Sequence, residues 1–342
     1  MTIDNATISV VKTINPPIPA STQLFASNFK VSISAFATGG RASFSGTDTD
    51  TGYVWPFSGG GSNQALKSVL SDCLLINNYV SGGITAANAG SYGRATIRDA
   101  VGAPGEKELF LELLDSGAID RVDHTNQPFG AQLDLEFSRI QDGMSPLPPD
   151  FNDLYVSHYF KFPASIATDL AVGGYTTIFD IKSGGYTNLY NGDNRITVGL
   201  IKGADGNLYT RTDGDRNANG SVIATSPDGI LPWVYDGTFS YWRETFKSFP
   251  ITLDAWHKFE IYIHRDAKNG ICLVSIDDTI VCYHVGRTLG EFGLPWGRIF
   301  PFLIYGNHGP GKGSVRRLRV HDYPPNGSAL QLPAASLLYR YG

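Results

Sequence analysis

Residues 257–284, HKFEIYIHRDAKNGICLVSIDDTIVCYH, decide the fold of this chain. Over residues 257–264 apolar side chains alternate with charged or polar ones, which is the period of a strand with one buried face. Two further runs follow, rich in the β-branched and aromatic residues that strands favour. The runs are separated by Asn269-Gly270 and Asp277-Asp278, residue types that favour tight turns. The stretch therefore predicts three consecutive antiparallel strands.

Similar runs, separated by turn residues, occupy most of the remaining chain. They lie at residues 131–138, 154–162, 176–182, 194–202, 207–213, 298–305 and 314–323. The phase of the alternation predicts a core that includes Leu133, Leu135, Phe137, Phe259, Ile261 and Ile263. Many short strands without alternating helices predict an all-β fold, a two-sheet antiparallel jelly-roll sandwich with one or two short helices.

The sandwich is expected to form a single domain over residues 25–325. Residues 1–24 contain prolines that cannot donate to a sheet ladder, and they are expected to form an extended lead-in. Residues 326–342 are expected to form a C-terminal extension. Inside the domain, residues 63–79 place apolar side chains at helical spacing, which predicts one short helix there.

The composition supports this fold class and excludes several kinds of partner. The chain has 39 Gly and 19 Pro, and only 17% of its residues are charged, as is typical of strands joined by tight turns. Its net charge of -5 argues against nucleic acid or an anionic membrane as the main partner. No apolar run approaches the roughly 18 residues that span a bilayer. The first residues show no signal-peptide pattern.

The cysteines form no recognisable metal or redox motif. Cys73, Cys272 and Cys282 make no C-x-x-C pair and no zinc pattern. Whether Cys272 and Cys282 can form a bridge depends on strand register, because a slip of one residue places them on opposite faces. All three are interpreted as free structural thiols.

Residues 252–284 resemble the late-strand signature of the concanavalin A-like jelly rolls. The resemblance rests on Trp256 at the start of a strand, on the Asn269-Gly270 and Asp277-Asp278 turns, and on residues 297–323 as closing strands. It covers about residues 90–323 and is greatest for the polysaccharide-lyase branch, which includes heparin-lyase-I-like and alginate- or glucuronan-lyase-like proteins. The resemblance implies an oligosaccharide lying across the concave sheet.

The catalytic motifs of that superfamily are absent, so candidate residues follow from the chemistry. The chain lacks the E-x-D-x-x-E motif of the laminarinase-like glycosidases and the R-[ST]-E-x-R and Q-I-H motifs of one alginate-lyase family. A lyase that acts on a uronic acid must neutralise the carboxylate, remove the proton at C5 and protonate the leaving oxygen. Arg, Asn, Gln or His can bind the carboxylate, and Tyr, His or Lys can transfer the proton.

The polar phases of three strands carry such residues. Tyr159, Lys182 and Arg211 are expected to converge, with Arg211 on the substrate carboxylate, Tyr159 transferring the proton and Lys182 supporting the tyrosine by its charge. His158 lies on the apolar phase, which favours a core histidine, and it is the fourth catalytic candidate. The competing interpretation is an exposed sheet tyrosine beside a solvated ladder of ion pairs.

Further residues are candidates for substrate binding. Trp242 and Arg243 belong to an aromatic, loop-like stretch that either lines the substrate or packs over a sheet end. The full set of substrate-binding candidates is Arg195, Tyr155, Tyr209, Trp242 and Arg243.

Three residues imitate the opening of a calcium-binding loop. Asp213, Asp215 and Asn217 have the D-x-D-x-N spacing, but Ala218 stands where an EF-hand needs glycine and the closing Glu is absent. A simpler calcium site on these residues is kept as a hypothesis. No other cofactor is expected.

The sequence thus predicts a polysaccharide lyase that cleaves an acidic, uronic-acid-containing glycan by β-elimination. Its partner would be an acidic polysaccharide, and its location extracellular or on a virus particle. The alternatives are a non-catalytic carbohydrate-binding module and a structural or adhesion module of a virion. A glycosidase is disfavoured because no paired-carboxylate motif is evident.

Overall fold

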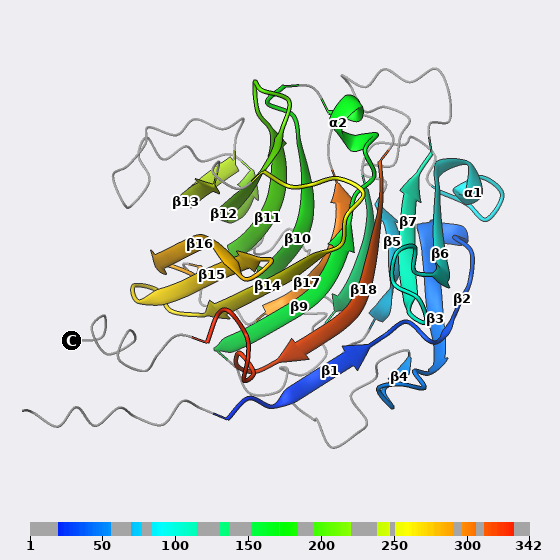
Figure 1. Ribbon diagram of the computed structural model, residues 1–342, viewed down its shortest axis with the longest axis horizontal. Helices are drawn as coiled ribbons and strands as arrows, with labels where there is room; N and C mark the ends of the chain where they lie inside the picture. Colours follow the sequence, from blue (N-terminus) through cyan, green and yellow to red (C-terminus); the bar gives the residue numbers. More distant parts are fainter. Residues whose placement is uncertain are drawn as a thin grey trace, which may run out of the picture.

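The computed structural model describes residues 20–55, 70–76, 84–114, 130–136, 152–170, 172–183, 194–219, 238–246, 250–290, 296–305 and 311–331. Nearly all its regular structure is β-strand, arranged in two sheets whose strand pairs are antiparallel (Figure 1). The short helices are α1 (Ala89–Tyr92), α2 (Ile166–Asp169) and the 3-10 turn η1 (Thr38–Gly40). The predicted antiparallel all-β sandwich is confirmed.

The first sheet, called sheet I, has eight strands. Their order is β16 (Thr279–Gly286), β15 (Gly270–Ile276), β14 (His257–His264), β9 (Asp153–Lys161), β18 (Lys312–His321), β7 (Lys107–Leu113) and β6 (Gly93–Asp99), with β1 (Gln23–Ser27) paired to β18. The decisive stretch of sequence forms β14, β15 and β16, as predicted. Asp277 and Asp278 have φ of 49° and 62°, the left-handed values that a tight hairpin turn requires.

The second sheet, called sheet II, has ten strands. Their order is β13 (Thr238–Phe246), β12 (Leu208–Asn219), β11 (Asn194–Lys202), β10 (Tyr175–Ser183), β17 (Trp296–Tyr305), β8 (Gly130–Glu136), β5 (Leu70–Ile76), β3 (Arg41–Thr47) and β2 (Ser32–Ile33), with β4 (Val54–Trp55) paired to β3. The chain crosses repeatedly between sheets, since β9 lies in sheet I, β10 to β13 in sheet II and β14 to β16 in sheet I again.

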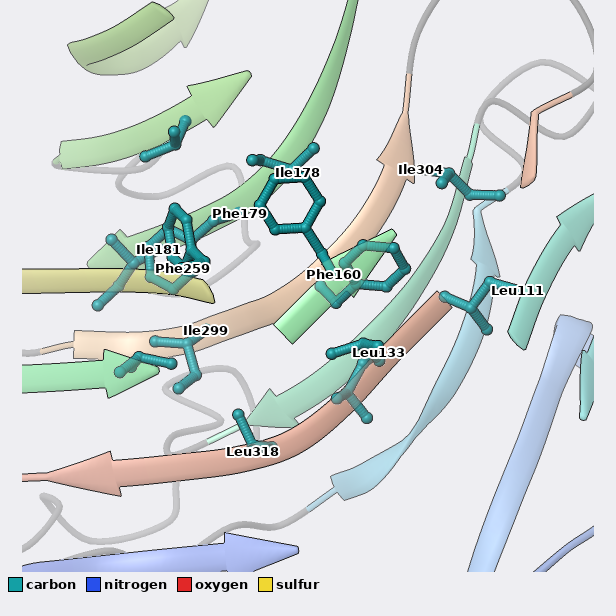
Figure 2. Close-up of a cluster of buried hydrophobic side chains, with 14 of the residues drawn as sticks. Leu111, Leu133, Phe160, Ile178, Phe179, Ile181, Phe259, Ile299, Ile304 and Leu318 are labelled. Carbon is teal, nitrogen blue, oxygen red and sulfur yellow. The ribbon is translucent and has the colours of Figure 1, made fainter. Parts of the chain in front are cut away.

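The core lies between the facing sides of the two sheets. Figure 2 shows Phe160 and Phe259 of sheet I beside Ile178, Phe179 and Ile181 of sheet II. The predicted core residues that the structure describes are all buried, namely Leu133, Leu135, Phe259, Ile261 and Ile263. Phe137 lies outside the described residues.

The predicted helix over residues 63–79 is wrong in the part that the structure describes. Leu70–Ile76 form strand β5, which pairs with β8 and β3. Cys73 and Leu75 are buried in the core, two residues apart as a strand requires. A short apolar run fits either period, and pairing with two neighbouring strands decides between them.

A C-terminal segment covers part of the outer face of sheet I. Tyr323 and Leu330 form a small buried cluster with Tyr155 and Tyr262, which point away from the main core. Burial raises the pKa of the Tyr155 phenol, and its hydroxyl donates to Glu260 at 2.7 Å. The outer face of sheet I is therefore sealed at this end.

The three cysteines are buried and free, as expected. Cys272 pairs with His284 and Val274 with Cys282, so both thiols point into the same core. No helix among the described ranges is long and apolar enough to cross a membrane.

Candidate functional site

Three basic residues lie side by side across the outer face of sheet II. Arg195 on β11 is the register partner of Lys182 on β10, and Lys182 is the register partner of Arg298 on β17. Side chains opposite one another on neighbouring strands lie close together, and like charges there repel. We call this set the cationic row. Neighbouring anions are needed to offset the repulsion between these three positive charges.

Each member of the cationic row has its own carboxylate. Arg195 donates to both oxygens of Asp215, with Nε 3.1 Å from each and Nη2 2.5 Å from Oδ2. The Lys182 ammonium lies 3.4 Å from Asp180 Oδ2. Arg298 donates from Nε to Asp134 Oδ1 at 2.6 Å. These pairs hold the basic groups in fixed positions at the sheet surface.

An aromatic ring lies between two of the basic groups. Phe300 on β17 has the Lys182 ammonium 5.3 Å and the Arg298 guanidinium 5.1 Å from its ring centroid. Phe300 is buried and is the register partner of Asp180. The cation–π contacts help to keep Lys182 and Arg298 beside each other.

A second basic group adjoins the cationic row. Arg211 on β12 donates to Asp213 at 2.8 Å, and Arg243 on β13 donates to the same carboxylate. The Arg211 guanidinium also lies 4.8 Å from the ring centroid of Tyr175 on β10.

Gly199 on β11 packs closely against the backbone of β10. It is the register partner of Arg211 and of Thr177, so it lies between β10 and β12 on the same face. A Cβ atom at Gly199 would approach the Thr176 carbonyl oxygen to 2.9 Å. A larger residue here would therefore clash with the backbone of β10.

Two buried polar groups on this face have unmet hydrogen-bonding capacity. Both amide atoms of Gln132 on β8 and Oδ1 of Asp180 are buried without a hydrogen-bond partner in the part of the chain that is described. Burial raises the pKa of the Asp180 carboxyl, and Lys182 and Arg195 oppose this rise. An unsatisfied amide and a carboxyl of raised pKa beside cations are features of ligand-binding and proton-transfer sites.

The structure brings four of the predicted site residues together on this face: Lys182, Arg195, Arg211 and Arg243. Tyr209 lies on the same face at the end of β12, where its hydroxyl contacts the turn residue Asp205.

The predicted convergence of Tyr159 with Lys182 and Arg211 is wrong. Tyr159 lies on β9 in sheet I, whereas Lys182 and Arg211 lie on β10 and β12 in sheet II. Tyr155 lies on the same outer face of sheet I as Tyr159, beneath the C-terminal segment. The physical reason is that the chain crosses from sheet I to sheet II after β9, so the polar phase of β9 lies on a different sheet from that of β10 and β12.

His158 and Trp242 point into the core and not onto a substrate face. His158 stacks on Phe259 with ring centroids 4.8 Å apart, and burial lowers its pKa to about 3. Trp242 lies in strand β13, not in a loop, where it stacks on His284 and donates from Nε1 to the Arg287 carbonyl at 2.8 Å. Both are therefore structural residues, which corrects their assignment as catalytic and substrate-lining.

The three residues of the calcium hypothesis lie in strand β12 and not in a loop. The Asp213 and Asp215 carboxylates accept hydrogen bonds from arginines, and the Asn217 side chain lies outside the described residues. No group of three or more His, Cys, Asp or Glu residues that could hold a metal ion occurs in the described ranges. Calcium binding stays a hypothesis.

The sequence alone does not single out Arg298, Gln132 and Tyr175 as site residues. Gln132 and Arg298 were visible as the polar phase of strands predicted at residues 131–138 and 298–305. Nothing in the sequence showed that β17 and β8 lie beside β10, because these neighbours are far apart along the chain.

Comparison with known proteins gives fold-level likenesses only. No family model and no curated protein sequence matches the chain. A structure of alginate lyase Aly36B is 14% identical with a TM-score of 0.41, and covers 72% of this chain and 96% of its own. An Aly36B mutant in complex with alginate tetrasaccharide is 12% identical with a TM-score of 0.44, and covers 89% of this chain and 97% of its own. Alginate lyase vAL-1 from Chlorella virus is 12% identical with a TM-score of 0.33, and covers 68% of this chain and 85% of its own. Similarity at this level does not identify the activity of this chain, which must be argued from its own residues.

Proposed function

We propose that the outer face of sheet II binds an acidic, uronic-acid-containing polysaccharide and cleaves it by β-elimination. The observation that carries the proposal is the cationic row, in which Arg195, Lys182 and Arg298 are direct register partners on adjacent strands. Each of the three groups already faces an aspartate, so the proposal requires a substrate carboxylate to bind the guanidiniums in addition to these aspartates.

The residues of this face can supply each step of the reaction. Arg195 and Arg298 present planar guanidinium groups that suit a substrate carboxylate, and they stabilise the negative charge that develops on it. Between them, Lys182 first releases the proton of its ammonium group to solvent and then removes the proton at C5 as a neutral amine. The C4–O bond then breaks as the C4–C5 double bond forms, and the proton passes from the ammonium to the leaving oxygen. Asp180, 3.4 Å from the amine, positions it.

The same face suits glycoside hydrolysis less well. A glycosidase needs two carboxyl groups that are available on either side of the scissile bond. Here Asp134, Asp213 and Asp215 each accept hydrogen bonds from arginine. Their charge is committed to holding the basic groups, so none of these three is available as an acid or base for hydrolysis.

Replacing Lys182 tests the proposal directly. The protein is incubated with alginate, glucuronan, hyaluronan and heparin, and the unsaturated product is followed by its ultraviolet absorbance. Lys182→Ala should lower turnover by about a hundredfold or more, because it removes the proton-transfer group while the guanidiniums that bind the substrate stay in place. The folded state is checked by circular dichroism and thermal unfolding.

Lys107 provides a control on the opposite sheet. Like Lys182 it lies beside one carboxylate, Asp99, at 2.7 Å, and it belongs to neither proposed binding surface. Lys107→Ala should leave turnover within about twofold. Equal turnover in wild type and Lys182→Ala would exclude the assigned role. Binding of these glycans without any turnover would instead identify a carbohydrate-binding protein.

A further inference from the structure

A second arrangement of aromatic and basic side chains lies on the outer face of sheet I. Trp256 has the Lys161 ammonium 4.6 Å and the Arg316 guanidinium 4.7 Å from its ring centroid. The guanidinium groups of Arg316 and Arg317 lie 4.5 and 5.8 Å from the ring centroid of Tyr159. We call these five residues the Arg317 surface. They come from β9, β18 and the turn before β14.

The backbone at Arg317 is held in an unfavourable conformation. Arg317 has φ of 54°, a left-handed value that is unfavourable for a residue with a Cβ. The pairing of β18 with β9 shifts register between Arg316 and Arg319. This irregularity brings two consecutive arginines onto the same carboxylate, Glu106, with Arg317 Nε 2.9 Å from Oε2. Such strain persists where the surroundings enforce it, and it is common at functional sites.

The basic groups of the Arg317 surface exceed the acidic groups that face them. Arg316 and Arg317 share Glu106. Lys161 lies 3.9 Å from Glu108, whose other oxygen accepts a hydrogen bond from Arg98 Nε at 2.6 Å. Arg316 is nine-tenths buried, and its Nε has no hydrogen-bond partner in the described part of the chain. A buried guanidinium N–H without a partner costs free energy that an anionic ligand would recover by reorienting the group.

We propose that the Arg317 surface is a second binding site for acidic polysaccharide, separate from the face that carries Lys182. Aromatic rings pack against the apolar faces of sugars, and paired guanidiniums bind carboxylate or sulfate groups. The Arg317 side chain is 47% exposed, so a ligand can reach it without rearrangement of the fold. The inference depends on the proposed function only for the chemical class of the ligand, and not on turnover.

Arg317→Gly gives the sharpest test because it separates binding from folding. Glycine adopts positive φ without strain, so this variant should unfold at the same temperature as wild type or higher. Loss of the guanidinium should raise the apparent Kd for polymer by about tenfold. Affinity is measured by retardation in native gels that contain alginate, glucuronan or heparin. Where the wild type cleaves a polymer, every variant also carries Lys182→Ala.

Arg94→Ala is the matched control. Arg94 is an exposed arginine on β6 of the same sheet, with a single carboxylate neighbour, Glu112, at 3.9 Å. The Arg94→Ala variant removes one positive charge outside the Arg317 surface. Its apparent Kd for polymer should differ from that of wild type by less than about twofold. Equal retardation of wild type, Arg317→Gly and Arg94→Ala in all three polymers would overturn the inference.

The two proposals fail in different ways. If Arg317→Gly binds polymer as wild type does while Lys182→Ala loses turnover, the second site is wrong and the lyase proposal stands. If no polymer is cleaved but Arg317→Gly weakens retardation, the second site stands and the lyase proposal is wrong. Absence of retardation for the wild type in every polymer rejects the second site.

Discussion

The side chain of His158 shows how one buried residue can link the core to solution pH. Its ring stacks on Phe259 between the two sheets, where the side chain is buried. Burial lowers its pKa from 6.5 to about 3. In the unfolded chain His158 takes up a proton as the pH falls below 6.5, whereas the folded protein does not until about pH 3. The contribution of this residue to the free energy of unfolding is therefore greatest above pH 6.5 and declines as the pH falls below that value.

Replacing His158 by Phe should remove this dependence. Each pH unit between 6.5 and about 3 costs the wild type about 1.4 kcal/mol through this group. From pH 7 to pH 4.5 the wild type should thus lose about 3 kcal/mol more free energy of unfolding than His158→Phe. Urea unfolding at both pH values measures the difference. Equal losses in the two proteins would mean that the ring is protonated in the folded state.

At the scale of single elements, strand β14 carries much of the core. Phe259 is fully buried, and its ring centroid lies 5.7 Å from that of Phe179 on the opposite sheet. Phe259→Ala should lower the free energy of unfolding by about 3 to 5 kcal/mol, because it removes a large side chain and leaves a cavity between the sheets. Val285→Ala on β16, where the valine is exposed, should change it by less than about 0.5 kcal/mol. A loss below about 1 kcal/mol for Phe259→Ala would show that the core closes around the gap.

Strands and their buried faces could be predicted from alternation alone, because period two is imposed locally by the pleat. The predicted phase of residues 154–162 holds, with Val156 and Phe160 inward and Tyr159 outward. Local pattern could not assign Leu70–Ile76, since a short apolar run satisfies a helix as well as a strand. This segment is a strand because it pairs with β3 and β8, and β8 is distant in sequence.

The site depended on information that no local pattern contains. The polar phase of each strand was visible, so Lys182, Arg195 and Arg211 were found. Which sheet each strand joins was not visible, because the crossing after β9 is decided by packing of the whole chain. Tyr159 was therefore assigned to the wrong face, and Arg298 was missed although it neighbours Lys182.

At the scale of the whole molecule, the two sheets bury their facing sides and leave two chemically distinct outer faces. The outer face of sheet II carries the cationic row and its carboxylates. The outer face of sheet I is divided, with the Arg317 surface in one part and an apolar cover by the C-terminal segment in another. The C-terminal segment limits the extent of the Arg317 surface on sheet I, because Tyr155 and Tyr262 beneath the segment are buried.

Removing one side chain from this cover should loosen it without touching either proposed site. Leu330 is 1% exposed and packs in a cluster with Tyr155 and Tyr323, apart from the main core. Leu330→Ala should lower the free energy of unfolding by about 2 to 5 kcal/mol, since a buried leucine is lost. It should also bring the pKa of the Tyr155 phenol back towards its usual value of 10.0, because burial is the main cause of the rise. Urea unfolding and titration of phenolate absorbance measure the two effects, with Val172→Ala, at an exposed valine, as the control. If stability falls but the tyrosine titration does not move, Glu260, whose carboxylate accepts from the phenol at 2.7 Å, and not the cover, holds the proton on Tyr155.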